Sequence, residues 1–346
     1  QKSNYIIIII AFYYSFNNRV YSMKEHGGDL YRAVMEFGGN KSEWIDLSTG
    51  INPNFYPVDS IENIDIHTLP SKDDIKNLID VARKFYHTNG FLNVSSGAQA
   101  AINLLPYLFP SGDVSIIEPT YNEYKETFLN TNWKVNIVNN LKKMEGSTIA
   151  IICNPNNPDG KIFYQDDLIK LSKKVDLLVI DESFMDLYPS LSMSNIINKN
   201  TKNIIILKSF GKFFGLAGVR LGFIISGKDI SKKIENLIGP WQVSNPAIIA
   251  GTQALKDDVW IQNNIQKLKK YAYKLDILAN QLNWRLIGGT YLYRLYETDS
   301  SIETQKKLAQ KKIWSRIFSY SNNWIRLGIP SEKKFLEVSS KLSKLF

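Results

Sequence analysis

The sequence has little cysteine and no apolar run long enough to cross a membrane. Cys153 is the only cysteine among 346 residues, so no disulfide can form within the chain, and a reducing cytoplasm is the location we expect. The apolar run Tyr5–Tyr14 has about ten residues, whereas a membrane helix needs about 20. No basic stretch carries interleaved aromatic residues. We therefore expect neither a membrane nor a nucleic acid as a partner.

The first 22 residues differ in composition from the rest of the chain. Their apolar run follows a single lysine, Lys2, and no clear small-residue cleavage site comes after it, so a signal peptide is poorly matched. The chain begins with Gln1, and its first methionine is Met23. We expect Met23 to be the true start, and we leave residues 1–22 outside the functional argument as an atypical leader.

The composition is that of a folded protein with more than one core. Apolar residues make up 44% of the sequence and aromatic residues 12%, which predicts packed cores rather than disorder. The length suits one large domain and a smaller one. The net charge of +9 is spread along the chain, and it is compatible with a phosphorylated substrate or simply with a lysine-rich composition.

Short apolar runs alternate with helical patterns in the middle of the chain, which predicts an α/β fold with a mainly parallel sheet sandwiched by helices. We expect an N-terminal arm over residues 23–57, a large domain over 58–244 and a small α+β domain over 245–346. The predicted strands are Val114–Glu118, Val135–Val138, Thr148–Cys153, Leu177–Asp181, Asn203–Lys208 and Leu221–Ile225, then Trp284–Ile287, Tyr291–Leu295 and Trp324–Gly328 in the small domain. The predicted helices are Ala98–Leu108, Tyr121–Asn130, Asp166–Lys174, Trp260–Asn283 and those at about 301–310 and 331–344.

A lysine follows one of these strands inside a segment that reads SFGKFFGLAGVR from Ser209 to Arg220. Lys212 can form a Schiff base with an aldehyde, while the Ser209 hydroxyl and the forked guanidinium of Arg220 can hold a phosphate. The glycines between them allow the backbone to approach a ligand closely. This spacing indicates a bound cofactor rather than a solvated glycine-rich loop.

Polar residues also follow other predicted strands, at the edge where open parallel sheets bind ligands. Asp181 ends an apolar strand and could pair with a protonated pyridine nitrogen, which would let the ring accept electrons. Asn157, in the segment NPNNPDG, could bond a ring oxygen, and Tyr121 could stack on the ring. The residues Gly97–Gln99 open a helix whose N–H groups could bind phosphate. Taken singly, each could equally be an ordinary strand end, turn, core tyrosine or helix cap.

Together and in this order, these residues resemble the fold-type I pyridoxal 5'-phosphate (PLP) enzymes, in the aminotransferase branch that includes histidinol-phosphate aminotransferase. The resemblance runs from about His26 to the C-terminus. It implies PLP as the cofactor and no metal. It further implies that Lys212 carries the Schiff base, Asp181 faces the pyridinium nitrogen, Asn157 bonds O3', Tyr121 stacks on the ring, and Ser209, Arg220 and the amides of Gly97, Ala98 and Gln99 hold the phosphate.

The same resemblance implies a homodimer with shared active sites. In that family a tyrosine of the N-terminal arm reaches the phosphate bound by the neighbouring subunit. Tyr56, in the segment NPNFYP that begins at Asn52, matches this tyrosine.

Longer segments are similar to the L-threonine-O-3-phosphate decarboxylases of cobalamin biosynthesis. This similarity implies decarboxylation of L-threonine O-3-phosphate to (R)-1-amino-2-propanol O-2-phosphate. One departure from the wider branch lies beside Asp181, because Phe184 stands where many aminotransferases have a tyrosine that bonds O3', and this argues against ordinary transamination. The matching segments are HGGDL from His26, WIDLSTGINP from Trp44, GPWQVSNP from Gly239, GGTYLYRL from Gly288 and WIRLGIP from Trp324.

The substrate carries two anions, a carboxylate and a phosphate, so at least two fixed cations must orient it. The bond at Cα that breaks is the one held perpendicular to the pyridine ring, and the anion contacts decide which bond that is. By the resemblance, Arg316 and Arg326 hold the two anions jointly, without an assignment of which holds which. His26 could add a contact from the arm, or it could be a surface or cap histidine, and Asn52 could hold the carboxylate.

Other functions remain compatible with the sequence. Histidinol-phosphate aminotransferase is also a PLP enzyme with a phosphorylated substrate. Transcription regulators with an aminotransferase-like domain need a DNA-binding module in front of it, which 22 residues cannot supply. A non-catalytic PLP-binding protein is a further alternative, although the cofactor positions are intact apart from Phe184.

Overall fold

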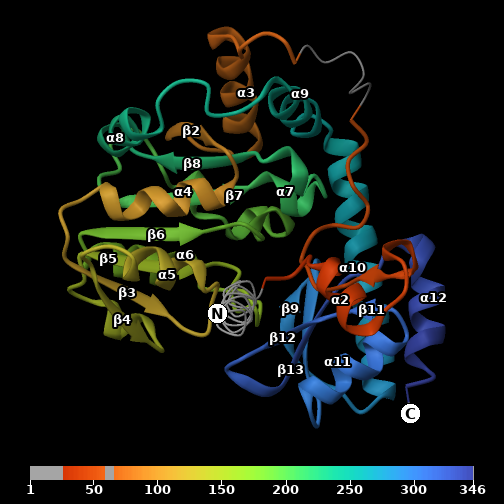
Figure 1. The fold of residues 1–346 in the computed structure, drawn as a ribbon. Helices are drawn as coiled ribbons and strands as arrows, with labels where there is room; N and C mark the ends of the chain where they lie inside the picture. Colours follow the sequence, from red (N-terminus) through yellow and green to blue (C-terminus); the bar gives the residue numbers. More distant parts are fainter. Residues whose placement is uncertain (1–25, 59–65, 346) are drawn as a thin grey trace, which may run out of the picture.

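The computed structural model describes residues 26–58 and 66–345, so the leader 1–22 and Met23 lie outside the described residues. A seven-stranded sheet runs through the larger part of the molecule (Figure 1) in the order β2-β8-β7-β6-β5-β3-β4. Within this sheet β8 runs antiparallel to both of its neighbours, and the other neighbouring pairs are parallel. The strands are β2 (Phe91–Ser95), β3 (Asp113–Ile117), β4 (Lys134–Val138), β5 (Ile149–Cys153), β6 (Leu177–Asp181), β7 (Ile204–Ser209) and β8 (Gly222–Ser226).

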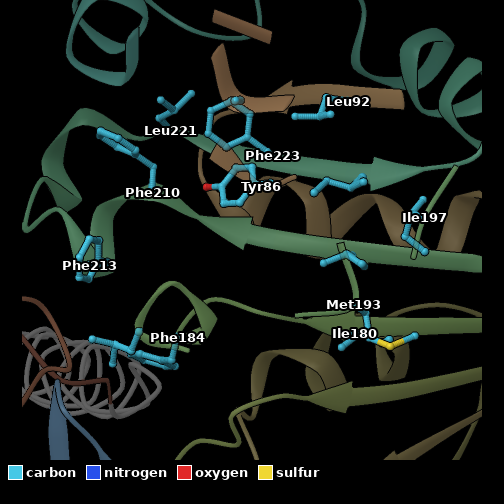
Figure 2. Packing of buried hydrophobic residues seen from close by; sticks show 14 of the residues in the cluster. Tyr86, Leu92, Ile180, Phe184, Met193, Ile197, Phe210, Phe213, Leu221 and Phe223 are labelled. Atoms are coloured by element: carbon cyan, nitrogen blue, oxygen red, sulfur yellow. The ribbon is translucent and has the colours of Figure 1, made fainter. Parts of the chain in front are cut away.

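Helices cover both faces of this sheet. On β6, Leu178 and Ile180 face a core shared with α3, α6 and α9, part of which is shown in Figure 2. Leu177 and Val179 face a second core shared with α4, α5 and α8. Burial on both faces explains why these strands read as continuous apolar runs. The helices are α3 (Lys72–Phe85), α4 (Ala98–Leu104), α5 (Glu123–Leu129), α6 (Gln165–Ser172), α8 (Lys228–Ile238) and α9 (Asn245–Ala254).

A smaller antiparallel sheet, in the order β12-β13-β10-β9, forms the second part of the molecule. Helices α10, α11 and α12 share an apolar core with this sheet. The α/β class with a mainly parallel sheet and a smaller α+β part is thereby confirmed, while the domain boundaries stay predictions. The elements are α10 (Asp258–Gln281), β9 (Arg285–Thr290), β10 (Tyr293–Glu297), α11 (Ser301–Gln310), β12 (Arg316–Phe318), β13 (Ser321–Gly328) and α12 (Glu332–Leu342).

The N-terminal segment packs first on the smaller part and then on the larger. Its strand β1 (Ile45–Asp46) pairs in parallel with β11 (Ile313–Trp314), and its helix α2 (Leu30–Phe37) contacts α11. Further along, the amide of Asn52 donates to the carbonyl oxygen of Lys212 at 3.0 Å. The segment therefore runs past the edge of the large sheet.

Among the described residues, no helix has both the length and the apolar character needed to cross a membrane.

Candidate active site

The carboxyl ends of β3, β5, β6 and β7 meet at one edge of the large sheet. The first residue of β8 lies at the same edge, opposite Ser209 of β7, because β8 runs the other way. A cavity of about 190 Å³ lies here. Its walls include these residues predicted from the sequence: Ala98, Gln99, Tyr121, Asn157, Asp181, Ser209, Lys212 and Arg220.

Lys212 lies in the short helix α7 (Phe210–Phe213), directly after β7. Burial lowers the pKa of its amine to about 8, and the positive charge of Arg326 adds to the effect. At neutral pH the neutral amine is then more abundant by roughly two orders of magnitude than for an exposed lysine. The neutral amine is the nucleophilic form, so this environment activates Lys212 for attack on a carbonyl carbon.

Asp181 ends β6 with both carboxylate oxygens engaged. The hydroxyl of Tyr124 donates to Oδ2 at 2.8 Å, and the amide of Ser183 donates to Oδ1 at 2.8 Å. The side chain is only 6% exposed, so these two donors keep a buried carboxylate in one orientation. Asp181 was predicted from the sequence, but Tyr124, which reaches it from α5, and Ser183, two residues further along the same loop, were not.

Gly97 packs tightly against Arg220, which lines the cavity. Gly97 has a φ of +80°, and a Cβ there would lie 2.5 Å from Nη2 of Arg220. Only glycine can satisfy both demands. Arg220 itself has a φ of +57°, and its Nη1 donates to the carbonyl oxygen of Ala217 at 3.0 Å. The guanidinium thus lies against the start of α4, which suits a phosphate.

A chain of polar contacts connects the predicted stacking tyrosine to the N-terminal segment. The hydroxyl of Tyr121 donates to Oε1 of Gln99 at 3.1 Å, and Nε2 of Gln99 lies 3.4 Å from Oε2 of Glu123. Oε1 of Glu123 lies 3.2 Å from Nε2 of His26. Burial raises the pKa of Tyr121 above its ordinary value, so its ring stays neutral. Glu123 therefore holds His26 near the cavity, a role that sequence analysis did not find.

A second cavity, of about 60 Å³, adjoins the first, since Tyr121 and Asn157 line both. It is also lined by His26, Arg316 and Arg326, as predicted for the substrate site. Five further lining residues were not predicted from the sequence: Gly27, Thr120, Asn122, Phe318 and Tyr320. Phe318 and Tyr320 lie next to Arg316, in and after the end of β12, and that proximity in sequence was the available signal.

Arg326 is the buried cation of this second cavity, with 7% of its surface exposed. Nη1 donates to Oδ1 of Asn157, and Nη2 donates to the carbonyl oxygen of Ser48 at 2.9 Å. Nε has no hydrogen-bond partner within the described parts of the chain. Burial lowers the pKa of Arg326 to about 10, so the side chain remains charged at neutral pH. A buried donor without a partner suits an anionic ligand.

Arg316 adds a second positive charge. Its guanidinium lies 5.5 Å from the centre of the Phe318 ring, and that of Arg326 lies 5.9 Å from the same ring. Two guanidinium groups beside one ring concentrate positive potential, which suits a substrate with two anions.

Gly97, which packs against Arg220, lines neither cavity, and two further predicted residues also lie outside the walls of both. Asn52 is buried, and its Nδ2 donates to the carbonyl oxygen of Phe213 at 2.7 Å, while Oδ1 accepts from the amide of Asn54. It therefore fastens the N-terminal segment to α7, and contact with the substrate carboxylate stays a prediction. The Tyr56 hydroxyl donates to Oδ2 of Asp257 at 3.3 Å, so a role for Tyr56 at a partner's phosphate also stays a prediction.

The donors around the first cavity fit PLP. The cavity combines an activated lysine, a fixed buried carboxylate and an arginine packed against a glycine that admits no Cβ. The lysine suits the aldehyde of the cofactor, the carboxylate suits its ring nitrogen, and the arginine suits its phosphate. In the described part of the chain, no group of three or more His, Cys, Asp or Glu side chains could hold a metal ion.

Known proteins are similar to this chain in sequence and in fold. The chain is 32% identical to threonine-phosphate decarboxylase of a Sinorhizobium species over 311 residues, 88% of this chain and 92% of that protein. It is 30% identical to threonine-phosphate decarboxylase of Pseudomonas aeruginosa, over 90% of this chain and 94% of that one.

The structure is similar to that of histidinol-phosphate aminotransferase from Sinorhizobium meliloti in complex with pyridoxal-5'-phosphate. The TM-score is 0.80 and the identity 14%, over 94% of this chain and 96% of that one, so this likeness shows the fold alone. Residues 64–341 match the family described as aminotransferase class I and II. The chain belongs to the class I and II aminotransferases.

Proposed function

We propose that this protein is a PLP-dependent decarboxylase that converts L-threonine O-3-phosphate to (R)-1-amino-2-propanol O-2-phosphate, for use in cobalamin biosynthesis. The observation that carries the proposal is a lysine-bearing cofactor cavity that adjoins a cavity lined by two arginines, Arg316 and Arg326. Similarity over nearly the whole chain to two proteins named threonine-phosphate decarboxylase supports it.

Residues of the first cavity would hold the cofactor. Lys212 would bind it covalently, Asp181 would face the ring nitrogen and Tyr121 would stack on the ring. Ser209, Arg220 and the amides at the start of α4 would take its phosphate. Because Oδ1 of Asn157 accepts from Arg326, the amide nitrogen of Asn157 is the atom that can donate to the ring oxygen. Phe184 offers no hydroxyl beside it.

Bound as a Schiff base, PLP supplies an electron sink for the pair released when a bond at Cα breaks. Residues of this chain would orient the substrate and transfer the proton. Arg316 and Arg326 bind the two anions of the substrate and so decide which bond at Cα is offered for cleavage. The Lys212 amine, with its pKa lowered to about 8, can carry a proton to Cα after CO₂ has left.

A homodimer with shared active sites and a cytoplasmic location are parts of the same proposal. Both follow from the sequence: the dimer from the match of Tyr56 to an arm tyrosine of the family, and the location from the single cysteine, Cys153. The mass of one chain is 39.6 kDa, so sedimentation of a single species at twice this mass would support the dimer.

The proposed reaction is tested with the purified protein, added PLP and L-threonine O-3-phosphate, by CO₂ release and by the mass of the product. We expect CO₂ and the amino-propanol phosphate in equal amounts. In parallel, histidinol phosphate with 2-oxoglutarate should give little glutamate. Amino transfer from histidinol phosphate without CO₂ release from threonine phosphate would instead assign the chain to the aminotransferase activity.

Variants connect the activity to the site. Lys212→Ala should abolish turnover, because no other group would hold the cofactor covalently. Lys232→Ala is the matched control, since Lys232 is an exposed lysine of α8, away from both cavities. Equal activity of the two variants would contradict the assignment of Lys212.

A further inference from the structure

A buried tyrosine of the small sheet is bonded to the loop that carries Asn157. The hydroxyl of Tyr293, in β10, donates to the carbonyl oxygen of Asn156 at 2.6 Å. The Tyr293 side chain is fully buried. The bond joins residues 137 positions apart in the sequence and crosses from the small sheet to the loop after β5. A shift of Tyr293 would therefore move the backbone carbonyl next to Asn157.

The same ring supports the buried arginine. The guanidinium of Arg326 lies 5.1 Å from the centre of the Tyr293 ring. Tyr293 pairs with Gly328 and Leu295 pairs with Arg326 across the β10–β13 ladder, so Tyr293 and Arg326 are diagonal neighbours on one face. A guanidinium at this distance from an aromatic ring is attracted to it. Tyr293 thus contacts both partners of the bond between Arg326 and the Asn156–Asn157 loop.

Close packing leaves the ring little freedom. The Phe184 ring meets it edge to face, with centres 5.0 Å apart, and a Cβ on Gly50 would lie 2.9 Å from atoms of both rings. Beside it the two backbones touch, since a Cβ on Gly160 would lie 2.2 Å from the carbonyl oxygen of Gly289. The loop after β5 therefore packs directly on the backbone of β9, with no room for a side chain between them.

We propose that Tyr293 is a positioning residue that keeps Asn157 and Arg326 in one arrangement, so that the ring-oxygen donor and the substrate-anion cation stay aligned. The proposal rests on the proposed function for the roles of Asn157 and Arg326. Its consequence is that loss of one hydroxyl, which touches neither cofactor nor substrate, alters the binding of both.

The test compares Tyr293→Phe with Tyr296→Phe. Tyr296 is the matched control, because it lies on the same strand, is also fully buried, and loses one bond, from its hydroxyl to Oδ1 of Asp276 at 2.8 Å. In Tyr293→Phe we expect KM for L-threonine O-3-phosphate to rise by roughly ten- to a hundredfold. The visible absorption band of the PLP-loaded protein changes with pH, and its midpoint is the pH at which half of that change has occurred. We also expect this midpoint to shift, since Asn157 is the donor to the ring oxygen.

Tyr296→Phe should change neither quantity, although both variants should lower the melting temperature. If the two variants give the same KM and the same midpoint, Tyr293 is merely structural and the proposal is wrong. The midpoint needs no turnover, so it still reports on Tyr293 if threonine phosphate proves not to be the substrate. If Tyr293→Phe does not fold, Gly50→Ala presses on the same ring and should shift the midpoint too. An unchanged midpoint in Gly50→Ala would then overturn the proposal.

Discussion

At the scale of single residues, the environment of Lys212 makes the chemistry possible at neutral pH. Burial, with the charge of Arg326 second, lowers the pKa of its amine to about 8 from an ordinary value of 10.5. The rate at which the cofactor-free protein captures PLP should therefore rise with pH through a midpoint near 8, because only the neutral amine attacks the aldehyde. Growth of the visible band measures this rate.

A matched variant tests the cause. Arg326→Gln removes the nearby positive charge, so the capture midpoint should move to higher pH. A midpoint near that of an exposed lysine in the unaltered protein would contradict the described environment.

Gly97 is the residue whose replacement should damage the cofactor site most selectively. Gly97→Ala would place a Cβ 2.5 Å from Nη2 of Arg220, at a φ of +80° that disfavours side chains. We expect PLP affinity to fall at least tenfold, or about 1.4 kcal/mol, because Arg220 must move away from the phosphate position. Titration of the cofactor-free variant with PLP measures this. Gly146→Ala is the control, since Gly146 also has a positive φ, +84°, but no atom within 4 Å of the added Cβ.

Much of the cofactor site could be predicted from the sequence, since Lys212, Asp181 and Asn157 each follow a recognisable strand. The residues that orient them could not. Tyr124 reaches Asp181 from another element, and Glu123 reaches His26 across 97 positions of sequence, so only the folded chain brings them together. For Asn52 and Tyr56 the motif match gave a predicted role. It could not show that each side chain has a hydrogen-bond partner within its own chain.

At the scale of elements, the ends of β6 and β7 are joined by a buried polar cluster. Nζ of Lys208 lies 2.6 Å from Oε2 of Glu182, and both side chains are almost wholly buried. Nearby, both carboxylate oxygens of Asp186 lack hydrogen-bond partners among the described residues. Burial raises the pKa of Asp186 to about 7, so the folded protein keeps this carboxyl protonated at pH values where the unfolded chain loses the proton.

The sign of the pH effect follows from that difference. Between about pH 4 and pH 7 the folded state binds more protons at Asp186, so this residue's contribution to stability falls as the pH rises. Asp186→Asn removes the titration, so the melting temperature of the variant should rise relative to the unaltered protein from pH 5 to pH 8. Asp176→Asn, the same change at an exposed position, is the matched control. A pH-independent difference for Asp186→Asn would contradict the raised pKa.

The predicted strands of the large sheet match the observed ones to within about two residues, because strands buried on both faces are continuous apolar runs. Strand β2 was not predicted, because Asn93 interrupts its apolar residues. In the structure, Oδ1 of Asn93 accepts a hydrogen bond from the Ser231 hydroxyl of α8 at 2.9 Å. Helix α4 was predicted too long. It ends at Leu104, and Pro106 lies in the following 3₁₀ turn, because proline has no N–H for a continuing α-helix.

At the scale of the whole molecule, the net charge of +9 and the two arginines of the second cavity favour doubly anionic substrates. The Debye length falls from about 10 Å at 0.1 M salt to about 3 Å at 1 M. We therefore expect kcat/KM for L-threonine O-3-phosphate to fall severalfold over this range, while kcat at saturating substrate changes little. A kcat/KM that is independent of salt would show that charge does not guide the substrate into the site.

The central claim is that one lysine, Lys212, carries the cofactor. Borohydride reduction of the PLP-loaded protein converts a Schiff base into a stable amine, and trypsin does not cleave after a lysine modified in this way. The account predicts that the added mass lies on the peptide 209–220, with Lys212 uncleaved. The mass on peptide 203–212 instead would place the cofactor on Lys208, the partner of Glu182. That result, or the absence of any labelled peptide, would contradict the account.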